Sequence, residues 1–131
     1  MTPENAVQAY RRVTVVGISA NPDRPSHWIA QYLKSHGFEV TGVNPGMPHV
    51  PGIEVVPSLA DVEGPLEIVD VFRSPAQIPP LMEELILLQP KVVWLQPGAQ
   101  NPEAEERGRS QGLEVISGPC IYQVHRHLGR S

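Results

Sequence analysis

The strongest constraint on the fold is the alternation of short, β-branched apolar runs with segments in which apolar residues recur at helical spacing. The apolar runs occupy residues 13–17, 38–43, 68–72, 91–95 and 113–116. They are too short for helices and are apolar on both faces, as is typical of strands buried between two layers. Such strands are fully buried when helices cover both sides of their sheet.

Parallel strands that are joined by helices need right-handed crossovers, which leaves few possible topologies. The sequence therefore predicts an α/β, Rossmann-like fold: a doubly wound parallel sheet of about five strands, order 3-2-1-4-5, with helices on both faces. In this numbering residues 68–72 form the third strand and residues 91–95 the fourth. A length of 131 residues suits one domain and is too short for two, so we expect residues 1–131 to form a single domain.

Capping residues and prolines mark where helices begin and where loops lie. Thr2 and Asn101, each followed by a proline, predict the starts of two helices. Ser26 is expected as the N-cap of the helix that follows the first strand. Residues 46–57 are rich in proline, so we expect mostly loop there, with room for an edge strand at 53–56.

Charge, cysteine and histidine content narrow the classes of function. The net charge of −4 argues against nucleic-acid binding, although a few local donors can still hold an anionic ligand. Cys120 is the only cysteine, which excludes an internal disulfide and a cysteine-based metal site. The five histidines lack metal-ligand spacing, so we expect no metal and no catalytic residues.

The sequence also bears on the location of the protein. The first apolar residues are interrupted by polar and basic ones, unlike a signal peptide, and no apolar stretch has the length of a membrane span. We therefore expect a cytoplasmic protein that does not bind membranes. No particular protein partner is predicted.

The fold class predicts where a ligand binds. In doubly wound sheets, ligands lie beyond the carboxyl ends of the strands, near the point where the strand order reverses. With the numbering above, that point lies between the first and fourth strands. The segments expected there are residues 17–27, 43–46, 72–75, 95–99 and 117–120.

The loop after the first strand is rich in small and hydrogen-bonding residues and leads into the N-terminus of a helix. Exposed backbone N–H groups and the helix dipole favour a bound anion at such a place. The alternative is a polar turn in which Ser26 only caps its helix, and the loop alone does not distinguish the two. The candidate ligand-binding residues in it are Gly17, Ile18, Ser19, Ala20, Asn21, Arg24, Ser26 and His27.

This loop differs from the glycine-rich fingerprint of dinucleotide-binding proteins. That motif, started at Gly17, needs two further glycines where this chain has Ser19 and Pro22. It also needs an acidic residue at the end of the second strand to bind the ribose, and Asn44 occupies that position. Two independent observations therefore disfavour an ordinary NAD site.

Three other strand ends supply further candidates. A proline ring can form a flat apolar wall for an adenine, and Arg73 can pair with a phosphate. Gly98 would let a ligand approach the backbone closely. The structural alternatives are a surface salt bridge for the arginine, chain reversal for the prolines and a tight turn for the glycine. The candidates in these segments are Val43, Asn44, Pro45, Phe72, Arg73, Ser74, Gln96 and Gly98.

Six sequence blocks, taken together, carry a family resemblance over nearly the whole chain, from about residue 13 to residue 128. The blocks are VVGISANPDRPSHWIAQYL, VNPG, SLADV, VDVFRSP, VWLQPGAQN and GLEVISGPC. In this order and spacing they resemble the small CoA-binding proteins whose fold matches the CoA-binding domain of the succinyl-CoA synthetase α subunit.

The resemblance implies that residues 17–26 hold the CoA diphosphate and that residues 43–45 and 72–74 surround the adenosine. The chain departs from the family pattern at two places. A lysine follows the Asn-Pro pair in the synthetase subunit, whereas Gly46 stands here, and the pair before Cys120 is not the Asp-Arg that is common in the small proteins. The synthetase's phosphorylated histidine belongs to a second domain, so ligase activity is not implied.

We therefore expect a protein that binds coenzyme A or an acyl-CoA as a non-catalytic binding, carrier or sensor module. One alternative is an NAD(P)- or nucleotide-binding regulatory protein on the same fold. A less favoured one is a small acyl-CoA enzyme that uses Cys120, which follows the last strand on the expected ligand side.

Overall fold

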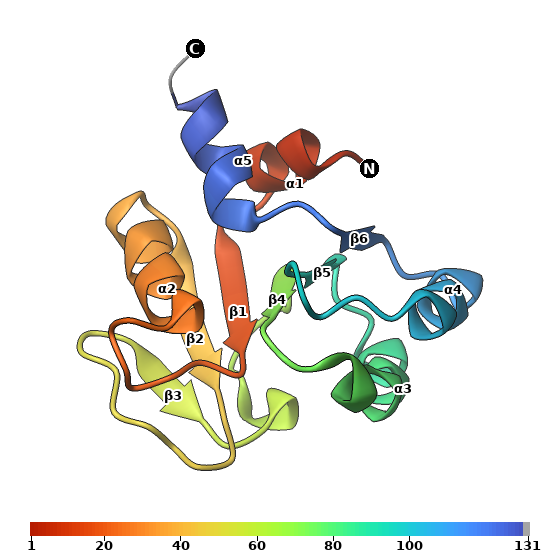
Figure 1. Ribbon diagram of the computed structural model, residues 1–131, viewed down its shortest axis with the longest axis horizontal. Helices are drawn as coiled ribbons and strands as arrows, with labels where there is room; N and C mark the ends of the chain where they lie inside the picture. Colours follow the sequence, from red (N-terminus) through yellow and green to blue (C-terminus); the bar gives the residue numbers. More distant parts are fainter. Residues whose placement is uncertain (130–131) are drawn as a thin grey trace.

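The computed structural model describes residues 1–129 as a parallel sheet with helices packed on both of its faces (Figure 1). The strands are β1 (Arg12–Val16), β2 (Glu39–Val43), β3 (Glu54–Val56), β4 (Ile68–Val71), β5 (Val92–Leu95) and β6 (Val115–Ser117). The α-helices are α1 (Pro3–Ala9), α2 (Pro25–Ser35), α3 (Ile78–Leu88), α4 (Pro102–Ser110) and α5 (Ile121–Leu128). Two short 3-10 helices, η1 (Leu59–Asp61) and η2 (Pro75–Gln77), complete the order.

The sheet has six strands in the order β3-β2-β1-β4-β5-β6, and all neighbours are parallel. The predicted doubly wound α/β fold is therefore confirmed, with one strand more than expected. The numbering of its strands was wrong, because β3 takes the third place and β4 pairs directly with β1. The strand order thus reverses between β1 and β4 (Ile68–Val71), whereas the prediction placed the reversal between the first strand and residues 91–95.

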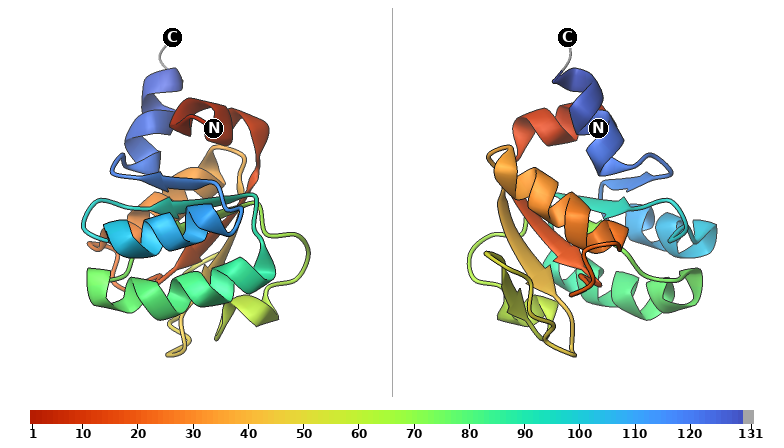
Figure 2. Two further views of the ribbon diagram at one scale, coloured as in Figure 1. Left: turned by 90° about the vertical axis from the view of Figure 1, so that its right-hand side faces the viewer. Right: turned by 60° about the vertical axis from the view of Figure 1, so that its left-hand side comes forward.

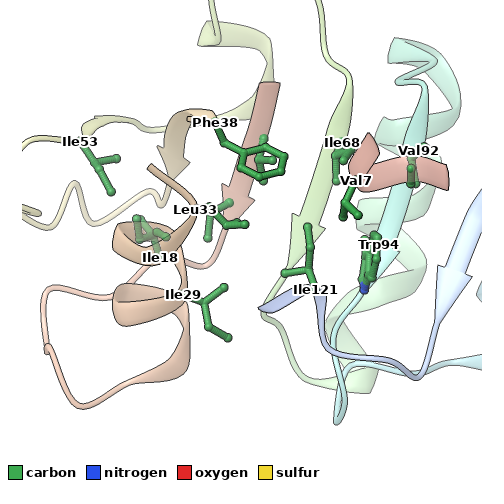
Figure 3. Close-up of a cluster of buried hydrophobic side chains, with 14 of the residues drawn as sticks. Val7, Ile18, Ile29, Leu33, Phe38, Ile53, Ile68, Val92, Trp94 and Ile121 are labelled. Carbon is green, nitrogen blue, oxygen red and sulfur yellow. The ribbon is translucent and has the colours of Figure 1, made fainter. Parts of the chain in front are cut away.

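Two apolar cores lie on opposite faces of the sheet. On one face α1, α2 and α5 pack against the strands, and Figure 3 shows Leu33, Ile121 and Trp94 among the side chains that fill this core. On the other face α3 and α4 pack side by side (Figure 2). Met82 and Leu85 of α3 are buried in the core on this face. The strands of the sheet's centre are buried from both sides, as their sequences predicted.

The helix starts are confirmed at two of the three predicted positions. The Thr2 and Asn101 side chains accept hydrogen bonds from the N–H groups of Asn5 and Ala104, both at 3.1 Å. Ser26 is not a cap: α2 begins at Pro25, two residues earlier than a cap at Ser26 implies, and Arg24 occupies the N-cap position. A proline suits the first helical position because its fixed φ matches the helix and its missing N–H would have no partner there.

None of the helices among residues 1–129 combines the length and the apolar character that crossing a membrane requires.

Candidate functional site

Two cavities open at the carboxyl edge of the sheet. The α2/α5 cavity has a volume of about 570 Å³, and its wall comprises Gly17, Ser19, Arg24, Pro25, Ser26, Trp28, Ile29, Phe72, Gln96, Pro97, Cys120, Tyr122 and Gln123. The η1/α3 cavity has a volume of about 660 Å³, and its wall comprises Val16, Val43, Asn44, Pro45, Pro57, Ser58, Leu59, Arg73, Ala76, Gln77, Pro80, Leu81 and Glu84. Ligand sites are concave and of this size, so both cavities are large enough to hold part of a cofactor.

The two cavities lie on opposite faces of the sheet and are separated by the ends of β1 and β4. Successive residues of a strand point to opposite faces. Accordingly Phe72 contributes to the α2/α5 cavity and Arg73 to the η1/α3 cavity. In the same way Gly17 contributes to the first and Val16 to the second. A ligand that fills both cavities therefore crosses the sheet edge at the point where the strand order reverses.

Gly17 keeps this crossing point narrow enough for the two strand ends to meet. Its φ of +88° lies in the region that side chains rarely adopt, and a Cβ there would lie 2.2 Å from the backbone oxygen of Phe72. Its N–H donates to the Val43 carbonyl at 2.9 Å. Glycine is thus required for the conformation and for the close approach of the β1 and β4 ends.

The loop between β1 and α2 is shaped by hydrogen bonds within itself. The Ser19 hydroxyl accepts from the Asn21 N–H, and the Asn21 side chain accepts from the Asp23 N–H, both at 3.0 Å. The His27 ring lies 2.7 Å from the Ser19 carbonyl oxygen. The side chains of Asn21 and His27, predicted as ligand contacts, therefore bond to the loop itself and lie outside both cavity walls.

Two more predicted residues, Ile18 and Asn44, hold the start of this loop in place through a hydrogen bond. Ile18 is fully buried in the apolar core, and its carbonyl accepts a hydrogen bond from the Asn44 side chain at 2.9 Å. The Asn44 oxygen in turn accepts from the Gly46 N–H. Ala20 is exposed and lines neither cavity. Of these three residues, only Asn44 reaches a cavity wall.

Ser26 differs from Asn21, His27 and Asn44 because its hydroxyl and N–H groups have no hydrogen-bond partner among residues 1–129. It is 5% exposed, it lines the α2/α5 cavity, and neither its hydroxyl nor its N–H makes a hydrogen bond within residues 1–129. The fully buried side-chain oxygens without a partner among residues 1–129 are those of Asp70, so the Ser26 hydroxyl reaches the space of the cavity. An unsatisfied donor pair at the first turn of α2, facing a cavity, is suited to an anion.

The arginines show the same contrast. Of the seven arginines in the described part of the chain, five bond through the guanidinium to a carbonyl, a carboxylate or a hydroxyl of the protein. The other two are Arg24 and Arg73, which make no such bond; one lines each cavity. Among residues 1–129 Arg73 forms no salt bridge, unlike the alternative considered for it. Each cavity has one guanidinium free to bind a phosphate or carboxylate.

Gln96, at the end of β5, fixes the N-terminus of α5 at the far end of the α2/α5 cavity. Its side chain is 4% exposed; the amide oxygen accepts from the Ile121 N–H at 3.0 Å and the amide nitrogen donates to Cys120 Sγ at 3.3 Å. Gln96, a predicted ligand-binding residue, lies in the cavity wall, and its amide is already hydrogen bonded to the protein.

Two predicted residues lie outside both cavity walls because local turns account for them. The Ser74 hydroxyl donates to the Gln77 side chain at 3.0 Å and forms part of the capping box of η2. Gly98 has a φ of +95°, and its N–H donates to the Gln100 side chain in the turn after β5. The tight-turn alternative for Gly98 therefore holds.

Sequence reasoning missed the aromatic wall of the α2/α5 cavity. Trp28 and Tyr122 meet edge to face, with ring centroids 4.9 Å apart, and join α2 to α5 beside the cavity. Trp28 is 39% exposed, whereas Trp94 is fully buried. Trp28 lies in the first turn of α2, directly after the predicted ligand-binding loop, and this position could have identified it as a candidate. No local sequence feature indicated that Tyr122 would pack against it.

Asp70 is a buried carboxyl directly behind the site. It lies two residues before Phe72 in β4, between Val15 and Trp94 of the neighbouring strands. Both its oxygens are buried and have no hydrogen-bond partner among the described residues. Burial raises the pKa of Asp70 well above its usual value, because the charged form is desolvated.

Comparisons with known proteins identify the family of this chain. Residues 11–126 match the model of a family described as a CoA binding domain. The protein YneT of Bacillus subtilis (strain 168) is 37% identical over 119 residues, which cover 91% of this chain and 88% of that protein.

Solved structures are similar over almost the entire chain. A Thermus thermophilus protein, cell-free ID.343, superposes with a TM-score of 0.91 at 32% identity, covering 98% of this chain and 99% of that one. A hypothetical protein from Pyrococcus horikoshii OT3 gives a TM-score of 0.89 at 31% identity, covering 98% of this chain and 92% of that one. The family match spans the sheet and both cavities, and the chain therefore belongs to the family of CoA binding domains.

Proposed function

We propose that this protein binds coenzyme A or an acyl-CoA across the carboxyl edge of its sheet, with the diphosphate next to Gly17. The observation that carries the proposal is the set of unpaired donors at this edge. Among residues 1–129, the side chains of Arg24 and Arg73 and the Ser26 hydroxyl have no hydrogen-bond partner, and they line the two cavities that flank the ends of β1 and β4. CoA is an extended ligand with phosphates near its middle, so it matches two cavities on either side of a sheet edge, each with a cationic group in its wall.

The diphosphate is assigned to the start of α2. The free N–H and hydroxyl of Ser26 and the guanidinium of Arg24 supply donors there, and the positive end of the helix dipole adds to them. The Ser19 hydroxyl accepts one hydrogen bond from the loop and still has its own proton to donate.

The adenosine is assigned to the η1/α3 cavity. Pro45, Pro57 and Leu81 give this cavity apolar walls for a flat ring, and Arg73 supplies its cationic group. The pantetheine arm then follows the α2/α5 cavity along Trp28 and Phe72 toward Cys120. The side chains present in both cavities therefore fit the chemistry of the ligand.

We assign a binding, carrier or sensor role without chemistry of its own. The carboxylate in the two walls is Glu84, in the η1/α3 cavity, and the thiol is Cys120, at the far end of the other. A cysteine nucleophile is activated by an adjacent base, whereas among residues 1–129 Cys120 Sγ is hydrogen bonded to the Gln96 amide, and Glu84 lies in the other cavity.

The proposal is tested by calorimetric titration with CoA and by thermal unfolding. At a CoA concentration about 100 times Kd the expected stabilisation is about 2.7 kcal/mol, or on the order of 5–10 °C in Tm. Arg73→Ala should weaken CoA binding at least about tenfold, because a charge-assisted bond is lost. Arg107→Ala is the matched control, since that arginine pairs with Glu83 away from both cavities.

Two results would contradict the proposal. One is the lack of any stabilisation by millimolar CoA, acetyl-CoA or a longer acyl-CoA. The other is stabilisation by NADH that exceeds that by CoA, which would favour a nucleotide-sensing protein instead.

A further inference from the structure

A third, smaller cavity adjoins the α2/α5 cavity at its far end. This α1/α5 cavity has a volume of about 220 Å³ and lies between α1 and α5, with Glu4, Pro119, Cys120, Gln123, Val124 and His127 in its wall. Cys120 and Gln123 belong to the walls of both cavities. The two spaces are therefore neighbours that share these two side chains.

The shared wall is held in place by buried groups. The indole N–H of the fully buried Trp94 donates to the Pro119 carbonyl at 2.9 Å. The Gln96 amide donates to Cys120 Sγ and accepts from the N–H of Ile121. The segment from Pro119 to the first turn of α5 is thus anchored to β5 at two points, and the boundary between the cavities is fixed with it.

The proposed course of CoA brings its thiol to this boundary. The diphosphate lies beside Ser26 at the start of α2, and the pantetheine arm follows the aromatic wall toward α5. Cys120 and Gln123 belong to the same wall, where they come from the start of α5, whereas Ser26 comes from the start of α2. A group attached to the CoA sulfur therefore continues toward the α1/α5 cavity.

We propose that the α1/α5 cavity binds the acyl group of an acyl-CoA, and that it takes a short, uncharged acyl chain. This inference rests on the proposed function. Pro119, Val124 and Cys120 form the apolar part of the lining, which favours a hydrocarbon chain, and Glu4, Gln123 and His127 form its polar part. The Glu4 carboxylate in its wall repels the free carboxylate of a dicarboxylic acyl group such as succinyl. The ligand class is thus an acyl-CoA such as butyryl-CoA.

Alkylation of Cys120 tests the inference directly, because this is the chain's single cysteine. The rate of its reaction with iodoacetamide is measured with saturating butyryl-CoA and with saturating desulfo-CoA, neither of which has a free thiol. Saturation is set by calorimetric titration of each ligand. We expect butyryl-CoA to slow the alkylation at least about tenfold more than desulfo-CoA does, since its acyl group covers Cys120.

The outcomes separate the two proposals. If neither ligand binds in the titration, the proposed function fails and the acyl site fails with it. If both ligands bind and protect Cys120 equally, CoA binding stands and the acyl site is refuted.

Substitutions of Val124 give an independent measurement, because this side chain lines the α1/α5 cavity and neither of the larger ones. Val124→Phe should weaken butyryl-CoA binding about tenfold relative to desulfo-CoA binding. Val124→Ala enlarges the cavity and should shift the preference toward hexanoyl-CoA. Glu4→Gln should raise succinyl-CoA affinity a few-fold with little change for butyryl-CoA. Equal effects on acylated and desulfo ligands in all three variants would overturn the assignment.

Discussion

The substitution Asp70→Asn should stabilise the protein increasingly as the pH rises. The carboxyl of Asp70 is fully buried between Val15 and Trp94, and both oxygens lack a partner among residues 1–129. Burial raises its pKa well above the usual value, so the folded protein keeps the proton at a pH where the unfolded chain has lost it. An amide has nearly the same shape and never ionises.

The sign and the size of the effect follow from proton linkage. An unfolded aspartate titrates near pH 4 (about 3.9). Between that pH and the raised pKa of folded Asp70, the unfolded state binds fewer protons, so the folding equilibrium weakens about tenfold for each pH unit. This loss stops once the pH exceeds the pKa of the folded state. At pH 7 it amounts to about 4 kcal/mol at most, and Asp70→Asn removes it.

The assay is urea denaturation followed by circular dichroism, from pH 4.5 to pH 8, for the wild type and Asp70→Asn. At pH 4.5 the unfolding free energies of the wild type and Asp70→Asn should differ by at most about 1–2 kcal/mol, because each protein buries one unsatisfied polar group. It should then grow with pH in favour of the variant. Asp23→Asn, at an exposed site, controls for the loss of one negative charge. A variant that is less stable than the wild type at pH 8 would refute the reasoning, because it would mean that Asp70 is charged and paired.

Three further predictions use other parts of the structure. Gly17→Ala should cost about 1–3 kcal/mol and abolish the thermal shift with CoA, because its Cβ would lie 2.2 Å from the Phe72 oxygen; unchanged stability and binding would contradict the geometry. Burial and two nearby basic side chains lower the pKa of His125, so unfolding measurements should show stability lost as the pH falls below about 6.5, and His125→Gln should reduce that loss. CoA should change the tryptophan emission in the wild type but not in Trp28→Phe, since Trp28 lines the α2/α5 cavity and Trp94 is buried; a full response in the variant would refute the placement.

Most of the fold was predictable because its signals are local. Each long β-branched run forms a strand, and the cap at Asn101 starts its helix where the sequence places it. The third strand was harder to identify, since β3 has three residues and none is buried. Its pairing with β2 displaces residues 68–71 to the centre of the sheet, which no property of those residues alone could indicate.

The candidate site was predictable at the level of segments but not of side chains. The loop after β1, the ends of β2 and β4 and the end of β5 all meet at the cavities. Tyr122, Gln123 and Glu84 were missed, because helix residues enter a site only through the packing of the whole chain. Cys120 was identified as a residue on the ligand side, and the structure places it in the cavity wall.

The two interpretations of the first loop, as an anion site or as a polar turn, apply to different residues of the same segment. Asn21 and His27 bond back to the loop and give it its shape. Ser26 is free of the capping role because Pro25 starts the helix, and its hydroxyl stays unbonded at the cavity. A composition rich in hydrogen-bonding residues could not separate these uses, since the separation depends on which donors the folded chain leaves unsatisfied. Those donors face the cavities without a protein partner among residues 1–129, so a ligand with acceptor oxygens can bond to them without breaking a hydrogen bond within the protein.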